Sequence, residues 1–153
     1  IGGYGMPFAL VLIKPELDIW EPGEHNGTFR GYQLSMVAAK AGLEVMLEEH
    51  VEEHVQELEK VISASMDDIR ALAPEKIKTR GIGFVWGVDF WRFDKEGKMS
   101  KRVQDIAFQK GLIIERVGRG NTVIKIMPEL LIDEPTLCKG LEILKAAIAE
   151  AIA

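Results

Sequence analysis

Residues 23–34 read GEHNGTFRGYQL and stand between an apolar, strand-like run and a long helical pattern. Three glycines are interspersed there with polar side chains, among them Asn26, Thr28 and Arg30. The first N–H groups of a helix have no partner within the helix, so a helix N-terminus readily holds a phosphate. The stretch is therefore either a helix cap built on Asn26 or Thr28, or a loop that offers hydroxyl and N–H groups to an anion.

The chain on either side of this loop predicts one strand and two helices before residue 74. FALVLI at residues 8–13 is a continuous apolar run of strand length, as expected of a strand buried on both faces. Residues 32–47 and 51–72 repeat apolar residues at helical spacing. One strand cannot make a sheet, so this part is expected to be incomplete unless other polypeptide supplies the rest. The glycine-rich opening at Gly2–Gly5, without an initiator methionine, likewise reads as the middle of a domain.

The first of these helices has an apolar face suited to packing. The residues that fall near this one face are Leu34, Val37, Ala38, Ala41 and Val45. Small residues also gather there, and they suit close approach of a neighbouring element: Ala38, Ala39, Ala41 and Gly42.

A break at Ala73-Pro74 separates this part from a second pattern of elements. The prediction is a strand at 81–90, a helix at 100–110 with Gly111 at its C-terminal cap, strands at 112–115 and 122–127, and a helix at 134–152 capped by Asp133. This order of strand, helix, strand, strand and helix is typical of an α+β layout. We therefore expect a domain boundary between residues 73 and 74.

Composition narrows the classes of function. The formal net charge of −5 and the pI near 5.3 argue against non-specific nucleic-acid binding, which needs a basic face. No signal peptide and no apolar run of membrane-spanning length are visible, so no membrane partner is expected. The single cysteine, Cys138, cannot form an internal disulfide and lies in a helical pattern, where it predicts a buried thiol. A reducing, cytoplasmic location is the simplest interpretation.

Two charged features have more than one interpretation. Lys125 stands in the middle of the apolar run VIKIMP at residues 123–128. It could meet a substrate carboxylate, or it could point to solvent by strand alternation, and spacing alone leaves both open. The acidic group around residues 48–53 is interpreted as a solvated helix face, and no metal site is expected.

Several segments taken together resemble the class III pyridoxal-phosphate-dependent aminotransferases. They are Gly3–Ala9, the long run Lys14–Gly31, Arg80–Gly83, Lys110–Glu115 and Lys125–Leu131. The resemblance covers essentially the whole chain. It implies an α/β fold of type I: the end of the large, cofactor-binding domain with its interface helices at residues 1–73, then a small α+β domain at residues 74–153.

The resemblance also implies a cofactor and roles for particular residues. Pyridoxal 5'-phosphate is the expected cofactor, and Thr28, with Gly27 and Asn26, would hold its phosphate across a dimer interface. Lys125 matches a position where many relatives use arginine to bind a substrate carboxylate, but lysine lacks the bidentate fork of arginine. The lysine that forms the Schiff base would fall just before Ile1, so no catalytic residue is expected within the chain.

The expected activity is amino-group transfer between small amino and keto acids in a homo-oligomer. The run Ile19–Asn26 favours enzymes that move the amino group of L-glutamate to L-aspartate 4-semialdehyde over those acting on ornithine, acetylornithine or 4-aminobutyrate. Without the Schiff-base lysine, this chain alone would be inactive. A non-catalytic dimerisation or interaction module is the alternative from another class.

Overall fold

The computed structural model describes residues 5–153, whose contacts divide into two compact units, Ile1–Val51 and Glu52–Ala153. The glycine-rich turn predicted at Gly2–Gly5 lies, except for Gly5, outside the described residues. Each unit is described separately below. No helix among residues 5–153 combines the length and apolar character that crossing a bilayer needs.

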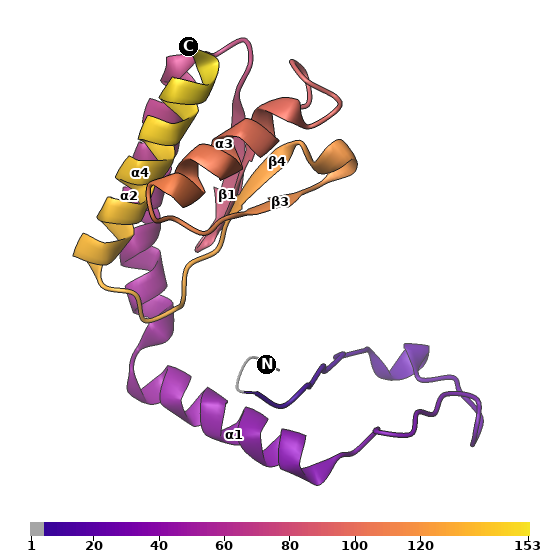
Figure 1. The fold of residues 1–153 in the computed structure, drawn as a ribbon. Coiled ribbons are helices and arrows are strands. Elements are labelled where there is room, and N and C mark those ends of the chain that lie inside the picture. Colours follow the sequence, from indigo (N-terminus) through magenta and orange to yellow (C-terminus); the bar gives the residue numbers. More distant parts are fainter. Residues whose placement is uncertain (1–4) are drawn as a thin grey trace. The chain divides into compact units, whose positions relative to one another are not determined.

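The first unit consists of an extended segment, a long loop and one helix (Figure 1). The loop contains a short 3₁₀ turn, η1 (Pro15–Leu17), and leads into helix α1 (Gln33–Glu48). The face of α1 that is buried carries the small residues Ser35, Ala39 and Gly42. The apolar stripe is instead exposed, with Leu34 at 59% and Val37 at 66%, so close packing of small side chains decides which face of α1 turns inward.

The strand predicted at residues 8–13 does not form within this chain. The segment is extended but pairs with no described strand, and Leu12 is 89% exposed. A strand exists only as part of a hydrogen-bonded ladder, and residues 5–51 contain no second strand to complete one. The prediction of a strand at residues 8–13 was wrong for the chain by itself. The segment is nevertheless apolar, as the prediction assumed.

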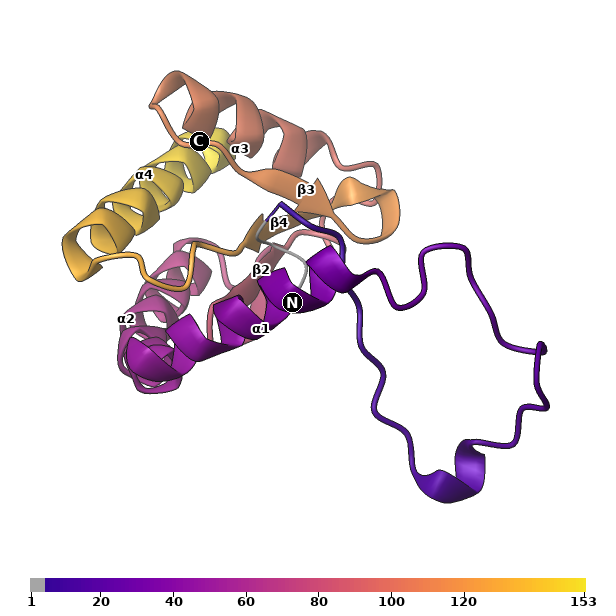
Figure 2. The same cartoon turned by 90° about the horizontal axis from the view of Figure 1, so that it is seen from below.

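The second unit is built from helices and one antiparallel sheet. Its elements are α2 (Val51–Leu72), β1 (Lys78–Ile82), β2 (Val85–Asp89), α3 (Lys98–Gln109), β3 (Glu115–Val117), the 3₁₀ turn η2 (Arg119–Asn121), β4 (Val123–Ile126) and α4 (Glu134–Ile152). The strand order is β1-β2-β4-β3, and every neighbouring pair is antiparallel. Figure 1 shows α2 and α4 side by side, and Figure 2 shows the same elements from below. The predicted mixed α/β class with an α+β C-terminal part is confirmed.

Two strand predictions in this unit were wrong in detail. Residues 81–90 contain the end of β1, the hairpin turn and the whole of β2 instead of a single strand. The turn at Gly83 has a φ of +55°, and Trp86 Nε1 donates to the Gly83 carbonyl at 2.8 Å. Positive φ favours glycine, so Gly83 reverses the chain where the apolar pattern alone suggested continuity. The strand predicted at 112–115 begins only at Glu115, where pairing with β4 starts.

One hydrophobic core holds the second unit together. The inward face of the sheet presents Val88 and Ile124, which are directly opposite each other and fully buried. They pack with fully buried side chains of all three helices, among them Ile62 of α2, Val103 of α3 and Ile148 of α4. Because α2 belongs to this core, contacts divide the chain after Val51, whereas the sequence analysis placed the boundary after residue 73. The division of the complete enzyme into large and small domains remains a prediction.

Carboxylates satisfy the first N–H groups of α3 and α4. Asp133 caps α4, as predicted, by accepting the Thr136 N–H at 2.8 Å. Asp94 serves α3 from outside the helix: its Oδ2 accepts the Met99 N–H at 2.7 Å, and its Oδ1 accepts the Glu96 N–H at 2.9 Å. The Met99 N–H bond is the main reason that the pKa of Asp94 lies below its usual value.

Candidate functional site

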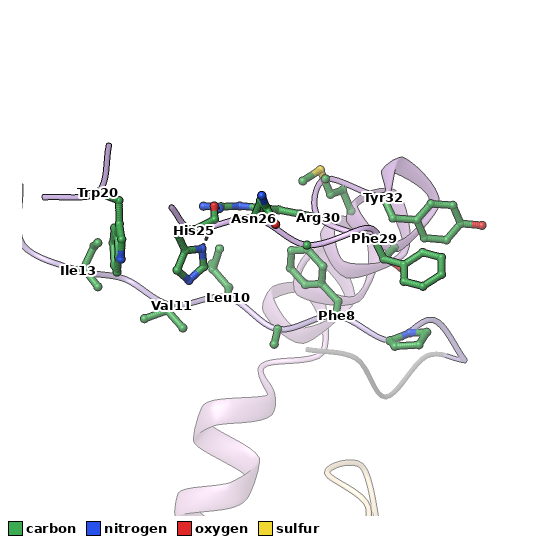
Figure 3. Close-up of a pocket in the computed structure, with 16 residues that line it drawn as sticks. Phe8, Leu10, Val11, Ile13, Trp20, His25, Asn26, Phe29, Arg30 and Tyr32 are labelled. Carbon is green, nitrogen blue, oxygen red and sulfur yellow. Dashed lines mark hydrogen bonds between the residues drawn. The ribbon is translucent and has the colours of Figure 1, made fainter. Parts of the chain in front are cut away.

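The predicted binding loop surrounds a cavity of about 1100 Å³ in the first unit. Figure 3 shows Phe8, Leu10 and Val11 of the extended segment on one side and the loop from His25 onward on the other. Its polar lining comprises His25, Asn26, Arg30, Tyr32 and Ser35, besides glycine backbone. No aspartate or glutamate is among the described lining residues, so the cavity can donate to an anion without opposing a negative charge.

Local hydrogen bonds fix the shape of the loop. The Arg30 guanidinium donates to the His25 carbonyl and lies 2.8 Å from His25 Nδ1. Asn26 Nδ2 donates to the Gly23 carbonyl at 3.2 Å, and Gly23 has a φ of +94°. The Arg30 N–H donates to the Gly27 carbonyl at 3.0 Å. These short-range bonds present Asn26 and Gly27 on the wall of the cavity.

Thr28 and Asn26 do not cap α1. The residue in the cap position is Tyr32, and no side chain accepts a hydrogen bond from the first turn of the helix. The cap interpretation of the loop is therefore wrong. Thr28 is exposed, and neither its hydroxyl nor its N–H has a partner among residues 5–153. Thr28 does not line the cavity, although its neighbours Gly27 and Phe29 do.

Ser35 is a polar residue of the cavity that the sequence analysis did not single out. It is only 2% exposed, and its Oγ has no hydrogen-bond partner within the described part of the chain. Helical spacing predicts that residue 35 lies on α1, but the burial comes from packing in three dimensions. No sequence signal distinguishes this serine from an ordinary one in the first turn of a helix.

Lys125 lies in the second unit, on the sheet face opposite Val88 and Ile124. In the register of the sheet it is opposite Gly87 of β2 and Glu115 of β3. Its Nζ forms an ion pair with Glu115, and its side chain is 27% exposed. Both residues border an apolar cavity of about 510 Å³ formed with α4. Lys125 is thus only partly exposed to solvent, and its ammonium group is already paired with a carboxylate.

The remaining features that the sequence analysis considered are the acidic group at residues 48–53, Cys138 and a metal site. The acidic residues Glu48, Glu49, Glu52 and Glu53 are exposed, as a solvated face requires. Cys138 is half-buried, less enclosed than predicted, beside the fully packed Leu137. In the described part of the chain, no group of histidine, cysteine, aspartate or glutamate is arranged to hold a metal ion.

The residues around Asn26 fit one end of pyridoxal phosphate. The Thr28 hydroxyl is a free donor, and a Cβ placed on Gly27 would meet nothing within 4 Å, so an oxyanion can approach the backbone. The described residues supply donors suited to the phosphate. Among the described residues, no lysine and no carboxylate lines the same cavity to contact the rest of the cofactor.

Comparison with known proteins relates the chain as a whole to one family. Residues 1–148 match the family described as aminotransferase class III. The chain is 44% identical to diaminobutyrate–2-oxoglutarate transaminase of Sporosarcina pasteurii over 153 residues, and 42% identical to that of Wolinella succinogenes. Each alignment covers 99% of this chain and 35% of the relative. The chain therefore spans about a third of the length of these relatives.

Solved structures agree on the fold. Acetylornithine aminotransferase from Elizabethkingia anophelis matches 87% of this chain and 34% of its own, with a TM-score of 0.71 and 24% identity. Adenosylmethionine-8-amino-7-oxononanoate aminotransferase from Methanocaldococcus jannaschii matches 85% of this chain and 30% of its own, with a TM-score of 0.72 and 27% identity. With a family match along almost its whole length, this chain belongs to the class III pyridoxal-phosphate-dependent aminotransferases.

Proposed function

We propose that this chain is the C-terminal part of a diaminobutyrate–2-oxoglutarate transaminase. The observation that carries the proposal is identity of 44% and 42%, along the whole chain, to two enzymes of that name. The complete enzyme transfers the amino group of L-glutamate to L-aspartate 4-semialdehyde, giving L-2,4-diaminobutyrate and 2-oxoglutarate. This reaction belongs to the cytoplasmic synthesis of the osmoprotectant ectoine.

The loop at Asn26–Thr28 serves the cofactor in this proposal. Pyridoxal phosphate, when bound, supplies the electron sink that makes amino-group transfer possible. Thr28 donates its hydroxyl to the cofactor phosphate, while Gly27 and Asn26 bring the backbone close. The exposure of Thr28, which does not line the cavity of its own unit, supports a role across the interface of a homo-oligomer. The Schiff-base lysine lies upstream of Ile1.

Lys125 binds a substrate carboxylate in this proposal, in competition with Glu115. A single ammonium makes a point-like contact instead of the planar fork of arginine. The place of Lys125 on the border of the apolar cavity beside α4 supports this assignment, and a substrate carboxylate would have to replace Glu115 as the partner of the ammonium. Lys125→Ala in the complete enzyme is expected to raise KM for the dicarboxylate substrate more than it lowers kcat.

A chimaeric enzyme tests the proposed substrate. Residues 1–153 replace the matching segment of the Sporosarcina pasteurii transaminase, and initial rates are measured with 2-oxoglutarate as amino acceptor. Diaminobutyrate is expected to give a higher kcat/KM than ornithine, acetylornithine or 4-aminobutyrate. A preference for ornithine in the chimaera, with the parent enzyme still preferring diaminobutyrate, would refute the substrate assignment.

The same chimaera tests Thr28. Thr28→Ala removes a hydrogen bond to a charged group and is expected to weaken cofactor retention by about 10- to 150-fold, since such bonds contribute about 1.5–3 kcal/mol. Thr79→Ala, at a half-buried threonine of β1, is the matched control and should leave cofactor dissociation unchanged. Equal cofactor dissociation in the two variants would remove Thr28 from the phosphate site.

A further inference from the structure

The chain has two asparagines, Asn26 and Asn121, and they lie in opposite surroundings. Asparagine is a chemically labile residue, because the carbonyl carbon of its side chain lies within reach of the backbone nitrogen of the next residue. Attack of that nitrogen closes a cyclic imide and expels ammonia. The reaction is favoured by an exposed asparagine, a small following residue and a following N–H group that no hydrogen bond holds.

Asn26 meets all of these conditions. Asn26 (Figure 3) and Gly27 are both exposed, and they lie in neither a helix nor a strand. The Gly27 N–H donates to no residue within 5–153, and a Cβ placed on Gly27 would meet nothing within 4 Å. Because glycine has no Cβ, the backbone rotates there with little hindrance, and the Gly27 nitrogen can approach Cγ of Asn26.

The hydrogen bonds of the loop leave this approach open. Asn26 Nδ2 donates to the Gly23 carbonyl at 3.2 Å, so this bond engages only the nitrogen that would leave as ammonia. The Arg30 N–H donates to the carbonyl of Gly27 at 3.0 Å and does not engage the Gly27 nitrogen. The Arg30 guanidinium donates to the carbonyl of His25, the residue before Asn26. A cation at this place favours the anionic form that the attacking nitrogen passes through.

Asn121 lacks these features. The residue after it is Thr122, which is β-branched and only 1% exposed. The Asn121 N–H donates to the Gly118 carbonyl at 3.1 Å, and the Asn121 carbonyl accepts the Ser100 hydroxyl at 2.5 Å. Packing and hydrogen bonds therefore hold this part of the chain, and the Thr122 nitrogen is kept from turning toward the Asn121 side chain.

We propose that the Asn26-Gly27 dipeptide is a site of spontaneous deamidation, a modification that consumes water and needs no enzyme. The Gly27 nitrogen bonds to Cγ of Asn26, and the bond between Cγ and Nδ2 breaks. The proton of the Gly27 N–H leaves with Nδ2 as ammonia, and a cyclic imide remains. Water then adds to one of the imide carbonyls and opens the ring. The product at position 26 is aspartate or, where water attacks the main-chain carbonyl, isoaspartate.

Either product brings a negative charge to a cavity whose described lining residues include no carboxylate. Under the proposed function, on which this consequence rests, the new carboxylate lies beside the cofactor phosphate and repels it. Isoaspartate also routes the main chain through the former side chain, which lengthens the backbone just before Gly27 and Thr28. Deamidation is therefore expected to weaken the hold of this loop on the cofactor.

Peptide mapping of the chain of 153 residues tests the site. The chain and a synthetic peptide of residues 21–32 are incubated side by side at mildly alkaline pH, and the digested chain and the peptide are analysed by mass spectrometry. The fragment with Asn26 is expected to give new species of equal mass, heavier than the parent by the exchange of an amino group for a hydroxyl. Asn121 should stay intact. An Asn26 that stays intact in the chain while the synthetic peptide converts, or equal conversion of Asn121, would overturn the proposal.

A substitution of the attacking residue tests the mechanism in the same chain. Gly27→Ala is expected to slow the conversion of Asn26 by about fivefold or more, because a methyl group restricts the backbone and hinders the approach of the nitrogen. Gly140→Ala on α4 is the matched control and should leave the rate unchanged. Equal rates in the two variants would show that the Gly27 nitrogen is not the attacking group and would refute the mechanism.

Two variants of the chimaera separate this proposal from the proposed function. Asn26→Asp places a carboxylate in the loop and is expected to weaken cofactor retention by about fivefold or more, which corresponds to about 1 kcal/mol. Asn26→Gln keeps the residue neutral and is the control. If Asn26 converts in the chain but both variants retain the cofactor equally, the deamidation site stands and the cofactor role of residues 26–28 is refuted. If Asn26 stays intact in the chain but Asn26→Asp alone loses the cofactor, the deamidation site is refuted and the cofactor role stands.

Discussion

At the residue scale, single side chains complete the ends of helices in the second unit. Asp94 shows this most clearly, because Gly97, the residue in the cap position of α3, has no side chain to offer. Asp94 reaches over the intervening turn and accepts N–H groups from Glu96 and Met99. The sequence analysis did not predict that this aspartate accepts N–H groups at the start of the helix that follows.

Asp94→Ala is expected to destabilise the chain by about 1 kcal/mol at pH 7, the usual effect of losing a capping carboxylate. The pKa of Asp94 is lowered from 3.8 in the folded state, so its contribution is complete above that value and is lost as pH falls through the lower folded pKa. Urea unfolding at pH 7 and at about pH 3 measures the difference, which should shrink in acid.

Asp105→Ala is the matched control on the same helix. Asp105 forms only an exposed ion pair with Lys101 one turn away, and such pairs contribute about 0.3–0.5 kcal/mol. Equal losses of stability in the two variants would show that Asp94 acts as a surface charge and not as a cap.

At the scale of elements, sequence patterns predicted helices well and strands less well. The helices at 51–72 and 134–152 have the predicted bounds, because their amphipathic repeats and caps are local signals. The hairpin of β1 and β2 was predicted as one strand, since the turn depends on a positive φ at Gly83 and on the bond from Trp86. The residue types of the loop pointed to Asn26 and Thr28, and the family resemblance then gave them a cofactor role. The burial of Ser35 instead depends on tertiary packing that no local pattern encodes.

The hairpin depends on a glycine at position 81. A Cβ at Gly81 would lie 2.3 Å from the Trp86 ring and 2.6 Å from the Val85 carbonyl oxygen. Gly81→Ala is therefore expected to destabilise the chain by about 1–3 kcal/mol or more, the range for overpacking. Gly140→Ala on α4 is the control, because its Cβ would meet only Leu112 at 3.8 Å and alanine favours helix. Thermal unfolding that ranks Gly140→Ala below Gly81→Ala would contradict this packing.

The segment at residues 8–13 is extended and apolar, but it pairs with no strand among the described residues. Leu10, Val11 and Leu12 are 61%, 79% and 89% exposed, which leaves an apolar surface that favours self-association. Leu12→Lys should therefore reduce aggregation of the chain, measured by light scattering, while leaving its unfolding transition unchanged. In the chimaeric transaminase the same substitution should impair assembly. A fully active, normally assembled chimaera would show that residue 12 stays exposed in the complete enzyme.

At the scale of the whole molecule, the two units differ in how complete they are. The second unit has a closed core to which three helices and the sheet contribute. In the described part of the first unit most large apolar side chains are exposed, and α1 buries only a small face. This contrast supports the proposal that the first unit belongs to a larger cofactor-binding domain, to which it brings the loop with Thr28.

The most direct test of this account is the intact mass of the chain after incubation with pyridoxal phosphate and reduction with borohydride. Reduction traps a cofactor joined to a lysine, so the mass reports whether one lysine reacts selectively. The account predicts no stoichiometric adduct at a single lysine, because the proposed function assigns the Schiff base to a lysine outside residues 1–153. One cofactor per chain, localised to one lysine, would contradict it and would mean that this chain holds a catalytic site of its own.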